Sequence, residues 1–593
     1  MKKLFVYLKD YKKESVLAPL FKLLEAFFEL LVPLVMASII DRGIATQDKG
    51  YIIRMGLCLL ALAVVGLCSS ITAQFFAAKA AVGFSTKLRT ALFGHIQDLN
   101  FTNIDKAGAS TMITRMTSDI NQVQSGVNMV LRLFLRSPII VFGAMIMAFT
   151  IDVQCALVFV VAIPLLAVVV FGIMMWTIPY YKKVQGRLDK VLGITRENLT
   201  GVRVIRAFHQ EEREEEHFRE NNRALSSLQL FVGKISACMN PMTYVIVNAA
   251  VMVLIYMGAI KVNIGSLTQG EVVAILNYMS QILVELIKLA NLIITVTKAL
   301  ACAERVAAVF DIQNEETAVG IEDGQTSQDN ADKEAYLSFE HVSLTYKGAG
   351  EKTLNDIHFT VNRGDTVGII GGTGSGKTSL VNLIPGFYPA TEGVIRLEGK
   401  DLREYGEEEL RNRIGVVPQK AVLFKGTISS NLRWGKPDAT EEEMWQALTL
   451  AQAKEIVEGK DGRLEAHISQ NGKNLSGGQR QRLTIARALV RKPEILILDD
   501  SASALDYATD ARLRAALRTL EDSTTTFIVS QRASTIRHAD KIIVLDDGEV
   551  AGIGTHEELL AGCEVYREIY YSQYPEETTG INRCRKETEN RHE

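Results

Sequence analysis

Six long apolar stretches fill the first half of the chain, and short apolar runs typical of β-strands fill the second. The six lie at about Val16–Ile40, Ile53–Ala80, Leu133–Thr150, Cys155–Trp176, Met239–Ile260 and Val272–Ile294. Each is long enough to cross a hydrocarbon core of about 30 Å, which takes about 20 helical residues. One such stretch could belong to a buried soluble helix, but six in one half predict an all-α membrane domain.

The connections between these stretches alternate in length. Three are short, around residues 41–51, 151–153 and 261–270, whereas the second and fourth, roughly 81–132 and 177–238, are long and polar with helical patterning. The long connections carry the basic residues Lys87, Arg89, Lys106, Arg115, Lys182, Lys183, Arg187, Lys190, Arg196, Arg203 and Arg206. Basic connections stay in the cytoplasm. We therefore expect a multi-pass protein of the cell membrane with both termini cytoplasmic. The hairpin tips, near Phe101–Lys106 and Arg206–Gln210, would either dock on another domain or lie in solvent.

A few charged residues stand out inside the predicted spans. Glu25 and Glu29 are four residues apart and share one helix face, and Glu285 and Lys288 are three apart in the sixth span. A charge at bilayer depth costs a few kcal/mol, so such residues usually face the bundle interior or a wet cavity. Two interpretations stay open: these residues line a substrate cavity, or they are structural, with Glu25 near the surface and Glu285 paired with Lys288.

A glycine-rich loop organises the second half. It reads Gly371, Gly372, Thr373, Gly374, Ser375, Gly376, Lys377 and Thr378, and it fits the phosphate-binding pattern G-x-x-x-x-G-K-[ST]. A buried strand, Thr366–Ile370, is expected before it, and a helix, Ser379–Ile384, after it. Backbone N–H groups of such a loop converge on phosphate oxygens at a helix N-terminus. Lys377 would reach the β- and γ-phosphates of ATP, and the Thr378 hydroxyl would hold Mg²⁺.

Further polar residues sit at the ends of predicted elements. A buried parallel strand at Ile495–Asp499 would bring Asp499 to the phosphate loop, to position Mg²⁺ through a water, with Asp500 beside the attacking water. The residues Leu475, Ser476, Gly477, Gly478 and Gln479 open the predicted helix Arg480–Leu489 and form an anion site. Tyr346, the last residue of the second of two β-like runs, Tyr336–Phe339 and Val342–Tyr346, is placed at a strand end where its ring could stack on adenine. Ile357–Val361 is a third β-like run before the glycine-rich loop.

In the order of these motifs the chain resembles the ATP-binding cassette (ABC) exporters, with the membrane domain first. The matches are Tyr346 for adenine stacking, Gly371–Thr378 with Ser379 for Walker A, Gln419 for the Mg²⁺-contacting glutamine, Leu475–Gln479 for the signature, Asp499 for Walker B and Asp506 for the D-loop. The resemblance implies ATP and Mg²⁺ as cofactors, two hairpin tips acting as coupling helices, and a head-to-tail dimer. In that dimer each ATP lies between the Walker loops of one chain and the signature and D-loop of the other.

Two positions depart from the pattern of the family. Asp500 stands where the resemblance implies a catalytic Glu, and Gln531 stands where it implies a switch His. Asp is one methylene shorter than Glu, and a misplacement of about 1 Å can cost on the order of 100-fold in rate. Gln531 can hydrogen-bond a phosphate but cannot accept a proton. The segment 468–472 also lacks the Glu that usually precedes the signature. We therefore expect a weak site in this chain, with Lys377, Asp500 and Gln531 as its catalytic group, and a heterodimer with a second half-transporter.

Composition agrees with a membrane domain (residues 1–310), a polar linker (311–335), an α/β P-loop ATPase domain (336–574) and a polar tail (575–593). The chain is 48% hydrophobic with a mean hydropathy of +0.11, and its net charge of −3 gives no reason to expect nucleic acid. The sequence predicts ATP-driven export of hydrophobic or amphipathic compounds, such as drugs, lipids or peptides. A homodimer with two slow sites and an ATP-gated channel are the alternatives. The six spans argue against a soluble ABC ATPase.

Overall fold

The computed structural model describes residues 4–314, 335–520 and 524–574. The chain forms two compact units. The first comprises residues 1–99 and 107–313, and the second comprises residues 100–106 and 314–593. Most of the expected linker and the whole expected tail lie outside the described residues.

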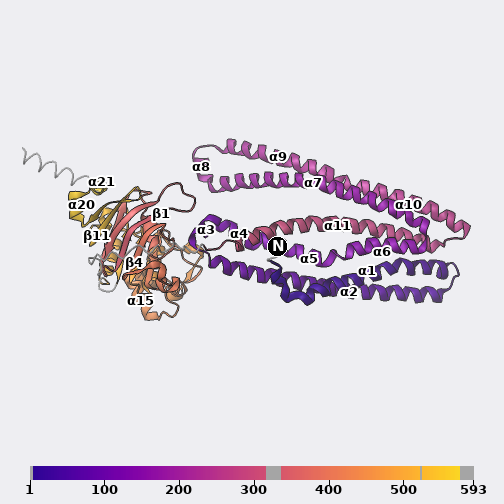
Figure 1. The fold of residues 1–593 in the computed structure, drawn as a ribbon, viewed down its shortest axis with the longest axis horizontal. Coiled ribbons are helices and arrows are strands. Elements are labelled where there is room, and N and C mark those ends of the chain that lie inside the picture. The colour runs from indigo at the N-terminus through magenta and orange to yellow at the C-terminus, as the bar shows by residue number, and fades with distance from the viewer. Residues whose placement is uncertain (1–3, 315–334, 521–523, 575–593) are drawn as a thin grey trace, which may run out of the picture. The chain divides into compact units, whose positions relative to one another are not determined.

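The first unit is all helical, and Figure 1 shows its long helices lying side by side. In chain order the elements are η1 (Leu4–Tyr11), α1 (Lys12–Ser38), η2 (Ile39–Ile44), α2 (Lys49–Gln97), α4 (Ala109–Thr114), η3 (Arg115–Asp119), α5 (Ile120–Leu133), α6 (Arg136–Ile151), α7 (Val153–Thr200), α8 (Val202–Ala207), α9 (Glu211–Ala237), α10 (Met239–Ile264) and α11 (Gln269–Phe310). Five of the predicted spans lie wholly within helical segments, and the third, Leu133–Thr150, crosses a turn at Phe134 and Leu135 before α6. Among the described residues six helical segments are long and apolar enough to cross a membrane. The prediction of a six-helix membrane domain is confirmed.

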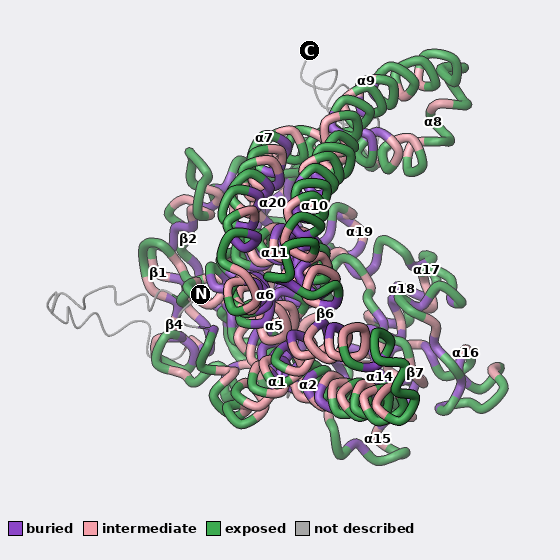
Figure 2. The backbone as a smooth tube through the Cα atoms, turned by 90° about the vertical axis from the view of Figure 1, so that its right-hand side faces the viewer, coloured by how far each residue is buried: buried purple, intermediate pink, exposed green. Residues whose placement is uncertain are grey.

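Small residues let these helices approach closely. A Cβ atom at Gly126 would lie 2.3 Å from the Ala299 side chain, and one at Gly143 would lie 2.5 Å from Leu30. Such contacts bring backbones together in membranes, where apolar area alone gives little drive for association. The Tyr278 hydroxyl donates to the Leu30 carbonyl at 2.6 Å and fastens α11 to α1. Figure 2 shows buried positions along the inner sides of these helices and exposed positions outside.

The two hairpin tips are short helices. The first tip is α3 (Phe101–Ala107), close to the expected Phe101–Lys106. For the second tip the prediction of Arg206–Gln210 is wrong by about four residues, because the helix is α8, Val202–Ala207. The difference has a local cause. Helix α7 stops at Gly201, and the left-handed φ of 50° at His209 turns the chain before α9 begins at Glu211.

The second unit is α/β. Its elements after α3 are β1 (Leu337–Leu344), β2 (Leu354–Val361), β3 (Thr366–Gly371), α12 (Lys377–Leu383), β4 (Glu392–Leu397), β5 (Lys400–Asp401), η4 (Leu402–Glu404), α13 (Glu407–Arg413), β6 (Ile414–Val417), β7 (Gly426–Thr427), α14 (Ile428–Leu432), α15 (Glu441–Leu450), α16 (Lys454–Glu458), η5 (Arg463–Glu465), β8 (His467–Ile468), η6 (Gln470–Gly472), α17 (Gly477–Leu489), β9 (Ile495–Asp499), α18 (Tyr507–Arg518), β10 (Thr525–Val529), α19 (Ala533–Ile536), β11 (Lys541–Asp546), β12 (Glu549–Gly554), α20 (His556–Gly562) and α21 (Glu564–Gln573). The two predicted runs Tyr336–Phe339 and Val342–Tyr346 are in fact one strand, β1, whose pairing with β2 shifts register between Phe339 and Val342.

The larger sheet determines where the candidate site residues lie. Its strand order is β12-β11-β3-β10-β9-β6, and the five strands from β11 to the edge strand β6 run parallel. Strand β9 is buried at every position, as its unbroken apolar run predicted. Because parallel strands end at the same edge of a sheet, the segments after β3, β10, β9 and β6 meet there.

Candidate nucleotide-binding site

The loop after β3 forms a turn that only particular residues can build. Gly374 and Gly376 have left-handed φ values of 89° and 90°, a conformation that costs glycine nothing. A Cβ at Gly376 would also lie 2.7 Å from the Leu354 side chain. The loop then opens helix α12 at Lys377, so its free N–H groups face the same space as the helix N-terminus.

Lys377 is folded into this loop. Its side chain is largely buried, and Nζ donates to the Gly371 carbonyl at 2.9 Å and to the Gly372 carbonyl at 2.5 Å. Burial lowers the pKa of Lys377, and the charges of Asp500 and Asp499 oppose that shift. A phosphate in the loop would offer this ammonium a charged partner in place of backbone carbonyls.

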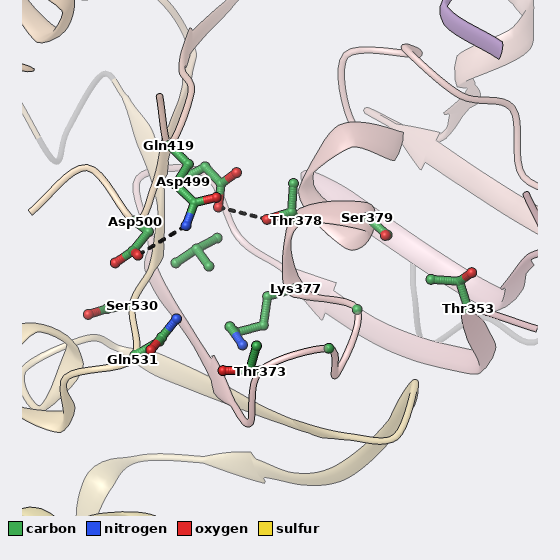
Figure 3. A pocket seen from close by; sticks show the side chains of 13 residues that line it. Thr353, Thr373, Lys377, Thr378, Ser379, Gln419, Asp499, Asp500, Ser530 and Gln531 are labelled. Carbon is green, nitrogen blue, oxygen red and sulfur yellow. Dashed lines mark hydrogen bonds between the residues drawn. The ribbon is translucent and has the colours of Figure 1, made fainter. Parts of the chain in front are cut away.

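Two carboxylates from the end of β9 face the loop (Figure 3). The Thr378 hydroxyl donates to Asp499 Oδ1 at 3.2 Å, and Gln419 Nε2 donates to Asp500 Oδ2 at 3.4 Å. Burial raises the pKa of Asp499, and the neighbouring Asp500 charge raises it further. Asp500 has a left-handed φ of 44°, which a short polar side chain tolerates better than most.

These groups surround one cavity of about 250 Å³. It is lined by Thr353, Thr373, Gly374, Gly376, Lys377, Thr378, Ser379, Gln419, Asp499, Asp500, Val529, Ser530 and Gln531. The structure therefore brings together most of the nucleotide, metal and catalytic residues that the sequence predicted. Thr353, Val529 and Ser530 were not predicted. Val529 and Ser530 could have been found as the carboxyl end of β10, beside β3, whereas no local pattern marks Thr353.

Gln531 projects from the segment after β10, and the C-terminal helix holds that segment. Gln573, the last residue of α21, donates through Nε2 to the Gln531 carbonyl at 2.8 Å and accepts through Oε1 from the Ala533 N–H at 2.9 Å. The Gln531 side chain itself stays exposed at the rim of the cavity. It can donate or accept a hydrogen bond there, but it offers no proton-accepting nitrogen.

Tyr346 lies two residues beyond β1 and does not line the cavity directly. Its hydroxyl donates to Ser379 Oγ at 3.0 Å, and Ser379 does line the cavity. The ring is thus held next to the start of α12, where a base attached to phosphates in the loop would extend. The contact of Tyr346 with adenine stays a prediction.

The signature and D-loop residues lie elsewhere on the unit. None of Leu475–Gln479 or Asp506 lines this cavity. Ser476 caps α17: its Oγ accepts from the Gln479 N–H at 3.3 Å, and Gln479 Oε1 accepts from the Ser476 N–H at 3.1 Å. Ser476 and Gly477 are exposed. A helix N-terminus with exposed Ser and Gly can receive an anion from outside the chain.

The charged residues singled out in the predicted spans belong to one network around Arg136, whose Nε lies 4.0 Å from Glu25 Oε1. Arg136, which the sequence reasoning passed over, donates to Glu285 Oε1 at 2.6 Å and to Glu29 Oε2 at 2.7 Å. Lys288 reaches the same Glu285 oxygen at 2.7 Å, and Lys22 pairs with Glu25 at 2.5 Å. The Glu285 side chain is only 3% exposed, whereas those of Glu29 and Lys288 are 39% and 41% exposed. The network ties α1, α6 and α11 together, and an arginine inside an apolar span was the signal that could have revealed it.

The comparisons with known proteins agree with this geometry. Residues 15–286 match the family described as "ABC transporter transmembrane region", and residues 354–503 match the family described as "ABC transporter". An uncharacterised ABC transporter ATP-binding protein of Mycobacterium tuberculosis is 36% identical over 97% of this chain and 98% of its own length. A putative multidrug export ATP-binding/permease protein of Bacillus subtilis is 32% identical over 97% of this chain and 99% of its own.

Among solved structures, a bacterial Atm1-family ABC exporter with ATP bound has a similar fold. The TM-score is 0.77 at 23% identity, and the match covers 95% of this chain and 98% of that one. The fold of that exporter therefore extends over both units of this chain.

Proposed function

The chain belongs to the ABC transporter family as an exporter-type half-transporter and transport ATPase, and on that premise we propose that it works as a heterodimer whose own ATP site is degenerate. One observation carries the proposal. Asp500 and Gln531 line the same cavity as Lys377 and Thr378, so both departures from the family pattern fall on a single site. A site altered at both its base and its switch position would bind ATP and hydrolyse it slowly.

The donor set of this cavity fits Mg²⁺. Thr378 offers a hydroxyl, Gln419 an amide oxygen and Asp499 a carboxylate, which are the hard oxygen ligands that Mg²⁺ prefers. No cluster of three His, Cys, Asp or Glu side chains suitable for a metal occurs among the described residues. Mg²⁺ is commonly held by one or two carboxylates together with substrate phosphates and waters. Bound Mg²⁺ would neutralise charge on the β- and γ-phosphates.

The exposed signature supports the partnership. Ser476 and Gly477 cap α17 without lining this chain's own cavity, and Asp506 caps α18 by accepting from the Thr509 N–H at 2.7 Å. We propose that these residues complete the partner chain's site, where a Glu and a His supply the base and the switch. Closure of the two cassettes on ATP would move the hairpin tips and through them the membrane helices. In this arrangement both termini and the cassette lie in the cytoplasm.

The transported compounds are proposed to be hydrophobic or amphipathic. The Bacillus subtilis relative is described as a putative multidrug export protein, and the membrane unit of this chain is largely apolar. The partly exposed charges of Glu29 and Lys288 give it two polar contacts at bilayer depth. These contacts would suit a compound with a polar head and an apolar body.

Gentle co-purification of this chain from its native membrane tests the pairing. A different half-transporter at one to one, with Glu after its Walker B Asp and a switch His, is the expected result. Asp500→Asn should then leave most of the ATPase activity of the complex. Replacing the partner's Walker B Glu with Gln should abolish that activity. Recovery of this chain as a homodimer, with activity lost in Asp500→Asn, would refute the proposal and favour two slow sites.

A second measurement separates the exporter from an ATP-gated channel. The purified complex in vesicles should accumulate a fluorescent amphiphile against its gradient when MgATP is supplied. Steady single-channel currents without accumulation would favour the channel instead. The Lys377→Ala variant is the control for ATP dependence, because Lys377 lies inside the phosphate loop.

A further inference from the structure

The first hairpin tip packs on an aromatic corner of the nucleotide-binding domain. Residues 100–106 belong to the same compact unit as the cassette. The Phe101 ring lies 4.6 Å from the Phe387 ring, and Asp105 Oδ2 accepts a hydrogen bond from the Tyr388 hydroxyl at 2.6 Å. Burial raises the pKa of Tyr388, and the hydrogen bond to Asp105 raises it further, so the phenol stays a donor at neutral pH.

This corner is fixed to the far end of the helix that begins at the phosphate loop. Helix α12 ends in a tight turn in which the Gly386 N–H donates to the Leu383 carbonyl at 3.1 Å and the Phe387 N–H donates to the Asn382 carbonyl at 3.2 Å. Gly386 has a left-handed φ of 67°, which this type of helix end requires. The phosphate loop and the aromatic corner are therefore the two ends of one short helix.

A second connection runs through the adenine platform. The rings of Tyr346 and Tyr388 meet edge to face, with centroids 5.1 Å apart and planes at 88°. Tyr346 also donates to Ser379 Oγ at 3.0 Å. The ring expected to stack on adenine therefore touches the ring that holds Asp105 of the hairpin tip.

We propose that Tyr388 is a positioning residue that makes the first hairpin tip respond to the adenine base as well as to the phosphates. A base stacked on Tyr346 restricts that ring. The edge-to-face contact then restricts Tyr388, and the hydroxyl holds Asp105 in one position. An aromatic pair of this kind is sensitive to ring orientation, because the edge of one ring must face the other. The inference rests on the proposed ATP site but not on the heterodimer.

Hydrogen exchange of the full-length chain in lipid nanodiscs, with the partner that co-purifies, tests this role. The measured quantity is the ATP-induced slowing of amide exchange at residues 100–107, under conditions that prevent hydrolysis. Tyr388→Phe keeps the ring and removes the hydroxyl, and Asp105→Asn weakens the acceptor from the other side. Loss of one hydrogen bond should reduce the slowing by about two- to tenfold. The two changes together should do little more than either alone, because they break the same contact.

Two controls separate this effect from a general one. Tyr405→Phe removes a hydroxyl that donates to the Leu397 carbonyl at 2.9 Å, away from the tip, and should leave the slowing unchanged. Magnesium tripolyphosphate, which lacks a base, should slow exchange at the tip less than MgATP at equal saturation. The affinity for ATP is measured separately. No binding in the wild type would count against the ATP site, whereas normal binding with unchanged tip protection would count against this inference.

Two results would overturn the inference. The first is full ATP-induced protection of the tip in Tyr388→Phe and in Asp105→Asn. The second is equal protection by tripolyphosphate and ATP, which would assign the signal to α12 and the phosphates alone.

Discussion

Replacing Arg136 with Met tests whether the charged network inside the membrane unit holds its helices together. Arg136 contacts Glu285 of α11 and Glu29 of α1 through separate guanidinium nitrogens. Met keeps most of the volume of the side chain but removes the charge. The change therefore removes the shared cation from its two close partners, Glu285 and Glu29, and from Glu25, which lies 4.0 Å away and keeps Lys22.

The two carboxylates should respond differently. Glu285 is 3% exposed and keeps only Lys288 and the Ser137 hydroxyl, which donates to Oε2 at 2.8 Å. Removing one partner of a buried ion pair costs about 3–5 kcal/mol. Because Lys288 still pairs with Glu285, we expect a cost near the lower limit, about 3 kcal/mol. Glu29 is 39% exposed and regains solvent, so Glu29→Gln should cost less than about 1 kcal/mol.

Hydrogen exchange along α11 in detergent or nanodiscs measures this cost residue by residue. A loss of about 3 kcal/mol corresponds to roughly 150-fold faster exchange through opening of the helix. The double variant Arg136→Met with Glu285→Met removes both charges and should recover most of the loss, because apolar residues often replace buried pairs without cost. Equal effects of Arg136→Met and Glu29→Gln, or a double variant worse than the sum of the single ones, would refute the reasoning.

Three further changes address the nucleotide-binding domain. Asp500→Glu together with Gln531→His should raise single-turnover hydrolysis at this chain's own site, by up to about 100-fold if the reach of the carboxylate is limiting; an unchanged rate would contradict this role for Asp500. Gln573→Leu removes both hydrogen bonds to the switch segment, each worth about 1 kcal/mol, and should speed exchange at residues 530–533 about tenfold or more, whereas Gln573→Glu, which keeps the acceptor, should speed it less. Hydrogen bonding from Arg413 holds the pKa of Glu494 below its usual value, so its stabilisation is present above about pH 4.5 and is lost as the pH falls through the lower folded-state pKa. Unfolding measured against pH should show a shallower acid slope in Glu494→Gln, and an identical slope would exclude this contribution.

The membrane spans and the phosphate loop could be predicted because their signals are local. An apolar stretch needs only its length, and Gly371–Thr378 carries its turn, its helix start and its charge within eight residues. The approach of Asp499 to that loop followed from parallel strands that end at one edge, whereas Gln419 was assigned from the family resemblance. These inferences use rules that connect neighbouring residues or adjacent strands.

The contacts that sequence reasoning missed join distant parts of the chain. Arg136 and Glu285 are 149 residues apart, and no local sequence pattern around either residue indicates that the two form an ion pair. Gln573, at the end of α21, hydrogen-bonds to the segment after β10, which lies 40 residues away in the sequence. The second tip was misplaced because a single left-handed residue, His209, decides where the turn falls. Such outcomes depend on packing, which periodicity does not encode.

The two arms of the second hairpin each lose helical hydrogen bonds at a similar distance from their outer ends. Pro179 stands 26 residues after the start of α7, and Cys238, where α9 gives way to α10, stands 26 residues before the end of α10. At 1.5 Å per residue both points lie about 39 Å from the outer ends of their helices. The Tyr180 and Phe231 rings meet beside them, with centroids 5.2 Å apart. Helix α2, by contrast, contains no proline in its 49 residues. Helix α2 thus keeps every backbone donor along its length, whereas Pro179 and the α9–α10 boundary remove helical hydrogen bonds from both arms of the second hairpin, where we expect bending to cost less.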